Sequence, residues 1–175
     1  LAKAGYKVKV FNRTASVAQK WIDEFGSSST CSSHDSPELA AREADVVLMC
    51  VGNDDDVRSV VYGDTGVLGG MKGGSVLVDH TTASQQLALE LAGQCDAKDI
   101  GFLDAPVSGG QAGAESGALT IMVGGSQRDY QKISPILNAY AKKTELMGEV
   151  GCGQLTKMVN QICIAGLPVS YTHLR

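Results

Sequence analysis

Short runs of apolar residues alternate with longer amphipathic stretches along most of this chain, and this alternation constrains the fold more than any other feature of the sequence. Residues 45–51 form a nearly continuous apolar run, which is typical of a strand in a parallel sheet that is covered on both faces. Residues 14–25 instead repeat apolar side chains such as Val17, Trp21 and Phe25 at helical spacing. Strands separated by helices imply βαβ units, so the sequence predicts an α/β fold with a doubly wound, mostly parallel sheet.

The remaining apolar runs and periodic stretches predict the other elements. Further strands are expected at residues 6–11, 75–79, 101–106, 119–123 and 144–147. Further helices are expected from residue 36 and at residues 54–62, 83–94, 128–140 and 154–167. Residues 27–33 are expected to be a short polar loop. Hydrophobic residues make up 43% of the chain, which is enough to form the packed core of a globular domain.

The two ends do not match a complete domain of the Rossmann type. Residues 1–5 resemble the last turn of a helix, but a Rossmann sheet has a strand and a Gly-rich turn before its first helix. At the other end, residues 168–175 break the apolar helical pattern. These residues are either a natural tail or foreign sequence. We expect a Rossmann-like NADP-binding domain over 1–150 without its first strand and Gly-rich turn. We also expect an interdomain helix over 151–167, where a helical domain starts, and a non-native tail over 168–175.

Charge and hydropathy argue against two kinds of partner. The formal net charge of −4 and a pI near 5.3 provide no basic surface for a nucleic acid or an anionic membrane. The longest apolar run, residues 46–51, is far shorter than the roughly 20 residues that a membrane-spanning helix needs. Residues 1–5 do not resemble a secretory signal. We therefore expect neither a nucleic acid nor a membrane as a partner.

The cysteines and histidines do not form a recognisable metal-binding or disulfide pattern. The five cysteines are odd in number, scattered, and never in a CxxC pair. His34, His80 and His173 lie far apart, and residues 54–56 lack the alternating oxygen ligands of a calcium loop. We expect no metal, and a reducing cytoplasm as the compartment.

Asn12, Arg13 and Thr14 follow the strand expected at residues 6–11. At this place a Rossmann fold usually carries an acidic residue that binds the ribose 2′-hydroxyl of NAD, and that acid is absent here. Arg13 instead offers a positively charged fork that is suited to a phosphate. The motif predicts NADP as the cofactor, with NAD as the alternative, although an ordinary solvated loop cation fits the same observation.

A turn rich in small residues follows the strand expected at residues 101–106. The turn comes at the carboxyl end of the strand, where open α/β sheets bind ligands. Ser108, Gly109 and Gly110 let backbone N–H groups approach an anion such as a substrate carboxylate. A simple Gly-Gly turn is the alternative interpretation.

A third motif, residues 151–161, begins with two glycines and continues as a helix. Lys157 and Asn160 are three residues apart on this helix, so they share one face and reach one cavity. A lysine in such a cavity is suited to exchange a proton with a substrate hydroxyl. A surface lysine and a capping asparagine are the alternative interpretation.

Taken in this order, the three motifs resemble those of the β-hydroxyacid dehydrogenase family, which includes 3-hydroxyisobutyrate dehydrogenases and tartronate semialdehyde reductases. The resemblance extends from residue 1 to about residue 167. It implies that Lys157 is the catalytic acid/base and that the substrate is held by Ser108, Gly109, Gly110 and Asn160. By position in the same pattern, the resemblance implies cofactor contacts from Val51, Gly52, Asp56 and Thr82. Gly52 and Gln161 depart from the family pattern, which commonly has proline and a second asparagine there.

The resemblance implies an NADP-dependent oxidoreductase that interconverts a small 3-hydroxy acid and its semialdehyde, and a parent protein that is a homo-oligomer. Family members begin with a GxGxxG turn and end with a helical domain, so we expect negligible activity from these 175 residues alone. Two alternatives remain open. One is a 6-phosphogluconate dehydrogenase-like enzyme, although that family usually has a histidine beside Asn160. The other is a non-catalytic binding or scaffold module on the same fold. Imine reductases typically replace the lysine that is present here.

Overall fold

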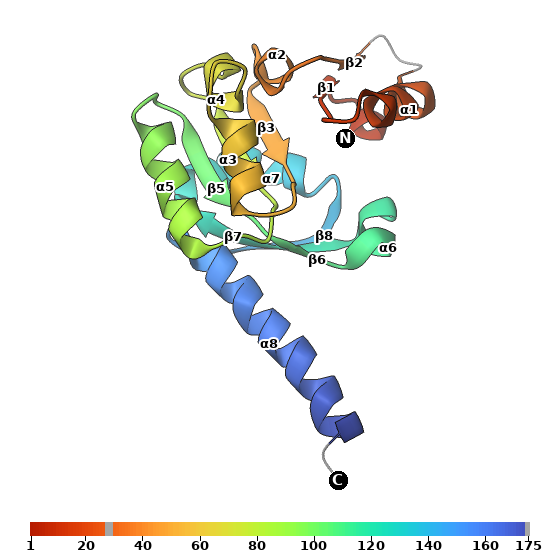
Figure 1. Ribbon diagram of the computed structural model, residues 1–175, viewed down its shortest axis with the longest axis vertical. Helices are drawn as coiled ribbons and strands as arrows, with labels where there is room; N and C mark the ends of the chain where they lie inside the picture. Colours follow the sequence, from red (N-terminus) through yellow and green to blue (C-terminus); the bar gives the residue numbers. More distant parts are fainter. Residues whose placement is uncertain (27–29, 174–175) are drawn as a thin grey trace.

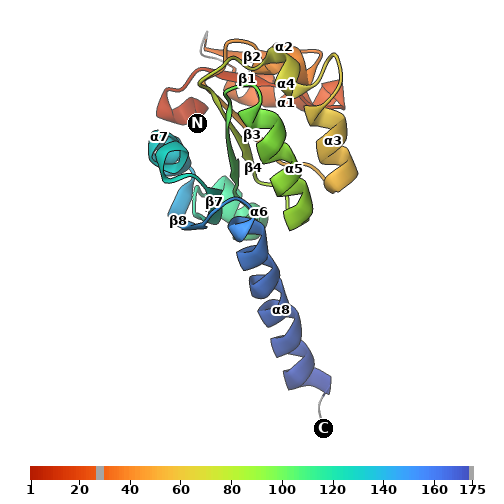
Figure 2. The ribbon, with the colours of Figure 1, turned by 90° about the vertical axis from the view of Figure 1, so that its left-hand side faces the viewer.

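The computed structural model describes residues 1–26 and 30–173, with side chains described up to residue 167. Strands and helices alternate as the sequence predicts, and helices cover both faces of the larger sheet (Figures 1 and 2). The strands are β1 (Val8–Val10), β2 (Cys31–Ser33), β3 (Val46–Met49), β4 (Val76–Asp79), β5 (Gly101–Asp104), β6 (Val107–Ser108), β7 (Leu119–Gly125) and β8 (Ala141–Gly148). The helices are the 3₁₀ turn η1 (Ala2–Ala4), α1 (Ala15–Phe25), α2 (Pro37–Ala41), α3 (Asp54–Val61), α4 (Val67–Gly70), α5 (Gln85–Asp96), α6 (Gly110–Glu115), α7 (Gln127–Leu137) and α8 (Cys152–His173).

The larger sheet has six strands in the order β3-β4-β5-β7-β6, with β8 also paired to β7. Strands β3, β4 and β5 are parallel in consecutive register, so their carboxyl ends meet at one edge of the sheet. Strand β7 is antiparallel to β5 and β6 and parallel to β8. The predicted Rossmann-type, mostly parallel sheet is therefore confirmed, with an antiparallel insertion that the sequence did not reveal.

Strands β1 and β2 form a separate, two-stranded parallel sheet. In Figure 1 this pair and α1 lie to one side of the larger sheet. The Rossmann strand order 3-2-1-4-5-6 assigns β2, β1 and β3 to its third, second and fourth strands. The place of the first strand is then between β1 and β3, and no strand of the described residues fills it. This arrangement matches the expected Rossmann sheet without its first strand.

Two apolar clusters hold the larger sheet between its helices. Leu77 faces a cluster that includes Val57 of α3 and Leu91 of α5, while Val78 faces another that includes Ile133 of α7. Alternation of β4 side chains between the two clusters explains why this strand is apolar at successive positions, since both of its faces are buried.

Some element boundaries differ from the sequence prediction. Strand β2 lies within residues 27–33, which were expected to be a loop, while residues 27–29 of that segment lie outside the described residues. The short elements α4, β6 and α6 were not predicted. Helix α8 begins at Cys152 and continues to His173, past the expected end at residue 167, so the backbone of residues 168–173 is helical. Residues 174–175 of the expected tail lie outside the described part of the chain.

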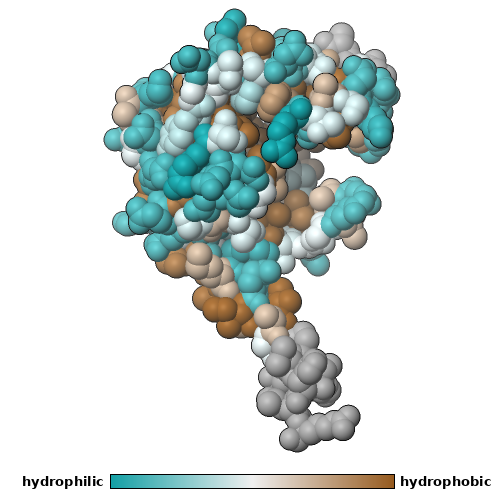
Figure 3. All heavy atoms as spheres, in the orientation of Figure 1, coloured by the Kyte–Doolittle hydropathy of each residue, from teal (hydrophilic) through white to brown (hydrophobic). Residues whose placement is uncertain are grey.

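Helix α8 projects away from the α/β body, as both ribbon views show (Figures 1 and 2). It exposes apolar side chains over much of its length, and Figure 3 shows them as a brown surface near the start of the helix. They are Leu155, Met158, Val159, Ile162, Ile164 and Leu167. Even so, none of the described helices is both long and apolar enough to cross a membrane.

The cysteines are all free thiols, and they are distributed between the core, the cavity wall and the surface. Among residues 1–26 and 30–173, no three His, Cys, Asp or Glu side chains gather closely enough to hold a metal ion.

Candidate active site

Lys157 lies in a cavity of about 470 Å³, near the carboxyl ends of the parallel strands. Its side chain is buried, and its Nζ donates a hydrogen bond of 2.9 Å to the carbonyl oxygen of Val107. The cavity is lined by Cys50, His80, Val107, Ser108, Gly109, Gly110, Ala114, Leu119 and Lys157. The structure therefore brings the turn 108–110 and Lys157 to one cavity, although they are far apart in the sequence.

Asn160 is not among the residues that line this cavity. It is half-buried, one helical turn beyond Lys157 on α8, and its side-chain amide donates to Oε1 of Gln161 at 3.1 Å. The helical spacing that places both residues on one side of the helix is confirmed. The role of Asn160 in holding a substrate stays a prediction.

His80 is a cavity residue that sequence reasoning missed. Its Nδ1 lies 2.6 Å from the carbonyl oxygen of Ala105, and its Nε2 lies 2.8 Å from the hydroxyl of Tyr140. Burial lowers the pKa of His80, which favours the neutral ring. Because a carbonyl oxygen only accepts, Nδ1 carries the hydrogen and Nε2 accepts from Tyr140. His80 therefore forms a neutral wall of the cavity and does not add a second cation beside Lys157.

Asp104 holds the beginning of α8 against the sheet. Its carboxylate accepts hydrogen bonds from the backbone N–H groups of Gly151, at 2.7 Å, and Gln154, at 2.8 Å. Burial raises the pKa of Asp104, and these backbone donors oppose that effect. An acceptor from β5 thus satisfies N–H groups that the first turn of the helix leaves without partners. This long-range cap fixes the position from which Lys157 enters the cavity.

Two glycines let α8 approach the sheet closely. A Cβ atom added to Gly153 would lie 2.5 Å from the carbonyl oxygen of Asp104 and 2.6 Å from that of Met122. A Cβ atom added to Gly124 would lie 2.7 Å from the backbone nitrogen of Gly153. All three distances are below any normal contact, so only glycine fits at these positions without a shift of the backbone.

Three of the predicted cofactor contacts lie on two loops that follow neighbouring strands. Val51 and Gly52 follow β3, and Thr82 follows β4. The loops are tied together because the backbone N–H of Val51 donates to the hydroxyl of Thr81 at 3.0 Å. Thr82 itself is exposed, whereas the neighbouring Thr81 is buried and makes this bond. The structure therefore brings these three predicted residues to one edge of the sheet.

Arg13 and Asp56 meet at the same edge. The Arg13 guanidinium is 90% exposed and lies 3.8 Å from the carboxylate of Asp56, at the start of α3. A pair this exposed and this long contributes little to stability, so the guanidinium is free to turn toward a ligand. A Cβ atom on Gly52 would lie 2.4 Å from the Asp56 carboxylate, so this side chain would have to move if a larger residue replaced Gly52.

Asn12 and Thr14 shape the turn that carries Arg13. Oδ1 of Asn12 accepts the backbone N–H of Thr14 at 2.8 Å, and Thr14 is the residue before α1. Asn12, Arg13 and Thr14 are all exposed. This turn therefore presents the Arg13 side chain to solvent, as a phosphate-binding residue requires.

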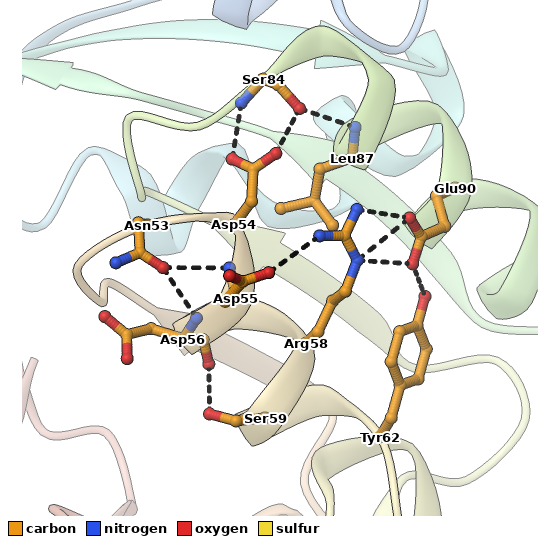
Figure 4. Close-up of polar contacts among 10 residues, drawn as sticks. All are labelled: Asn53, Asp54, Asp55, Asp56, Arg58, Ser59, Tyr62, Ser84, Leu87 and Glu90. Carbon is orange, nitrogen blue, oxygen red and sulfur yellow. Dashed lines mark hydrogen bonds and ion pairs between the residues drawn. The ribbon is translucent and has the colours of Figure 1, made fainter.

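A polar cluster between α3 and α5 holds the loops after β3 and β4 in place (Figure 4). The carboxylate of Asp54 accepts hydrogen bonds from both the backbone N–H and the hydroxyl of Ser84, and these bonds lower the pKa of Asp54. One turn further along α3, Arg58 forms an ion pair of 2.8 Å with Glu90 of α5. Tyr62 donates to the same carboxylate at 2.9 Å. The loops after β3 and β4 are thereby fixed relative to each other.

Asp79 is a buried carboxylate at the end of β4. Burial raises its pKa from the usual 3.8 to about 6, although a hydrogen bond of 2.8 Å from the Thr81 backbone N–H opposes the shift. Between these two values the folded protein binds more protons at Asp79 than the unfolded chain does. The free energy of unfolding should therefore fall as the pH rises from about 4 to about 6.

Asp79→Asn is expected to stabilise the protein at pH 8, by up to about 3 kcal/mol, because an amide has no charge to bury and still accepts the Thr81 N–H. The gain should shrink toward zero at pH 4. Chemical unfolding of the wild type and of Asp79→Asn at several pH values measures this gain in the free energy of unfolding. The substitution Asp35→Asn, at an exposed position, is the matched control. A pH-independent effect of Asp79→Asn would contradict this interpretation.

Comparison with known proteins identifies relatives along most of the chain. Residues 1–151 match the family model described as the NAD binding domain of 6-phosphogluconate dehydrogenase. An uncharacterized oxidoreductase of Shewanella frigidimarina is 53% identical over 167 residues, which make up 95% of this chain and 56% of that protein. The probable mitochondrial 3-hydroxyisobutyrate dehydrogenase-like 1 of Arabidopsis thaliana is 43% identical over 166 residues, 94% of this chain and 48% of that protein.

A solved structure gives the same result. The 3-hydroxyisobutyrate dehydrogenase of Mycobacterium tuberculosis with L-serine has a TM-score of 0.85 and 29% identity, over 93% of this chain and 53% of that one. The chain thus spans about half the length of the relatives it matches. Because the family model covers residues 1–151 and named relatives share the rest of the matched length, the chain belongs to the β-hydroxyacid dehydrogenase family of nicotinamide-dependent oxidoreductases.

Proposed function

We propose that the protein containing this chain is an NADP-dependent dehydrogenase that interconverts a small 3-hydroxy acid and its semialdehyde. The observation that carries the proposal is the cavity that joins Lys157 to the turn 108–110, next to the loops of the predicted cofactor contacts. The turn supplies backbone N–H groups for a carboxylate, and Lys157 supplies a group that exchanges a proton.

In the proposed reaction Lys157 acts on the substrate hydroxyl. During oxidation its neutral amine takes the hydroxyl proton while the carbinol C–H bond breaks, and during reduction its ammonium returns that proton to the carbonyl oxygen. The nicotinamide supplies the hydride acceptor or donor. The hydrogen bond from Nζ to the Val107 carbonyl keeps the amine at one place in the cavity. The remaining hydrogen-bonding positions of the nitrogen are left for the substrate. Asn160 would orient the substrate.

Arg13 is the basis for NADP as the preferred dinucleotide. Its exposed guanidinium follows β1 and fits a 2′-phosphate, while Asn12 stands beside it with no carboxylate to bind a free 2′-hydroxyl. Val51, Gly52 and Thr82 would contact the cofactor from the loops after β3 and β4, and Asp56 would contact it from the first turn of α3. Arg13 therefore fits a 2′-phosphate at the adenosine end of the dinucleotide, and NAD is the alternative cofactor.

The lining of the cavity favours a small hydroxy acid over a sugar phosphate. Among the described residues that line it, Lys157 is the cation, and the pKa of His80 is lowered, which keeps its ring neutral. A phosphorylated sugar acid calls for further cationic groups to bind its phosphate. We also propose that the parent protein is a homo-oligomer in the cytoplasm. We propose neither a nucleic acid nor a membrane as its partner.

Turnover by the full-length protein tests the proposal. We expect oxidation of 3-hydroxyisobutyrate or reduction of tartronate semialdehyde, with a higher kcat/KM for NADP(H) than for NAD(H). The change in nicotinamide absorbance measures the rate of either reaction. Turnover of 6-phosphogluconate in preference to these substrates would support the 6-phosphogluconate dehydrogenase-like alternative. Tight dinucleotide binding without turnover of any hydroxy acid would instead indicate a binding or scaffold module.

A further inference from the structure

Gln154 is a fully buried polar side chain in the first turns of α8, and it contacts the loop that follows β4. Its Oε1 accepts the backbone N–H of Ala83 at 3.0 Å. Its Nε2 donates to the carbonyl oxygen of Thr81 at 2.7 Å. One side-chain amide thus joins a helix to a loop that is more than 70 residues away in the sequence.

These two backbone groups belong to the peptide units on either side of Thr82. The Thr81 carbonyl is part of the peptide bond before Thr82, and the Ala83 N–H is part of the peptide bond after it. With both units held by Gln154, the backbone at Thr82 has little freedom to rotate, while its side chain remains exposed. Thr82 is also the residue of this loop that the family resemblance assigns to the cofactor.

Gln154 and Lys157 are three residues apart in α8, so they lie on neighbouring positions of one helix face. Both are buried where the helix meets the sheet. The backbone N–H of Gln154 is fixed in turn by Asp104, so the residue cannot slide along the sheet edge. A displacement of the loop at Thr82 would therefore have to displace the helix turn that carries Lys157, or break the two hydrogen bonds of the Gln154 side chain.

We propose that Gln154 is a positioning residue that sets the spacing between Thr82, on the cofactor side, and Lys157, on the substrate side. This inference rests on the proposed function, because it concerns how that site brings cofactor and acid/base group together. The amide is needed because it offers one donor and one acceptor to two opposite backbone groups. A methionine has the same reach and offers neither bond, and a glutamate offers both only when its carboxyl group is protonated.

The test compares Gln154→Met, Gln154→Glu and the wild type of the full-length protein, with the exposed Gln131→Met as the matched control. Hydrogen exchange without ligands should show faster exchange of the Ala83 amide in Gln154→Met, by about tenfold or more. NADPH affinity should fall several-fold, and kcat should fall about 10- to 100-fold, the order expected for a displaced reacting group. KM for the hydroxy acid should change much less than kcat.

Gln154→Glu adds a readout that a loss of packing alone would not move. Its activity relative to the wild type should rise as the pH is lowered, because the protonated carboxyl group restores both bonds. If Gln154→Met fails to fold, this variant carries the test. Unchanged Ala83 exchange in Gln154→Met would overturn the inference. Faster exchange with unchanged NADPH affinity and kcat would overturn it as well, since the amide would then serve only stability.

Failure of the proposed function gives a different result. In that case the wild type turns over no hydroxy acid, and the exchange and NADPH-affinity measurements still decide whether Gln154 fixes Thr82.

Discussion

Lys157→Ala is expected to lower kcat by about 10²–10⁴-fold, the usual contribution of a positioned acid/base group. The loss follows from the position of Nζ in the cavity, where it is held by the Val107 carbonyl and faces the turn 108–110. Affinity for NADPH should stay within a few-fold of the wild type, because the predicted cofactor contacts lie on other elements of the fold. Steady-state kinetics of the full-length protein with its best substrate measure the effect.

Two further variants separate chemistry from charge in this experiment. Lys157→Arg keeps a positive charge but does not release a proton near neutral pH, so it should be nearly as inactive as the alanine variant. Lys142→Ala, at an exposed position of β8, is the matched control and should keep full activity. Near-wild-type turnover of Lys157→Ala would show that the lysine is structural and that the mechanism is wrong.

Gly153→Ala is expected to destabilise the protein by about 3 kcal/mol, because overpacking of a close contact forces the backbone to move. The added Cβ would meet two backbone carbonyl oxygens, of Asp104 and Met122, neither of which can rotate away. The start of α8 should separate from the sheet, so activity should fall together with stability. Chemical unfolding and steady-state kinetics of the same preparations measure both effects.

Gly93→Ala is the matched control for this prediction. Gly93 lies inside α5, and a Cβ atom added to it would meet nothing within 4 Å. Alanine is the better helix former, so this variant should be unchanged or more stable by about 0.5–1 kcal/mol. Equal stability of Gly153→Ala and the wild type would mean that α8 is not seated on the sheet as closely as described.

The sequence predicts best those elements whose pattern is set by burial on both faces. Strand β4 is an example, because Val76, Leu77 and Val78 are all apolar and all buried. Strand β2 was missed because Cys-Ser-Ser has no apolar alternation, and its pairing with β1 is what makes it a strand. Strand β6 is only two residues long and follows a proline, so only its antiparallel pairing with β7 identifies it.

The site could be predicted where a local motif carries the chemistry, as with Lys157 and the turn 108–110. Residues that act through distant partners left no such signal. His80 meets Tyr140 across 60 residues, and Asp104 meets the start of α8 across about 50. In the sequence, Gln154 is indistinguishable from an ordinary helical residue, and only the fold brings it into contact with the loop at Thr82. Their polarity alone does not distinguish them from surface residues, so their roles depend on tertiary contacts.

The most direct test of the proposed site is a structure of the full-length protein with NADP(H) and a 3-hydroxy acid. We expect the substrate carboxylate to meet the N–H groups of the turn 108–110, and the hydroxyl oxygen to lie within hydrogen-bonding distance of Lys157 Nζ. The 2′-phosphate should meet the Arg13 guanidinium. A substrate bound away from this cavity, with Lys157 still paired only to Val107, would contradict the proposed active site.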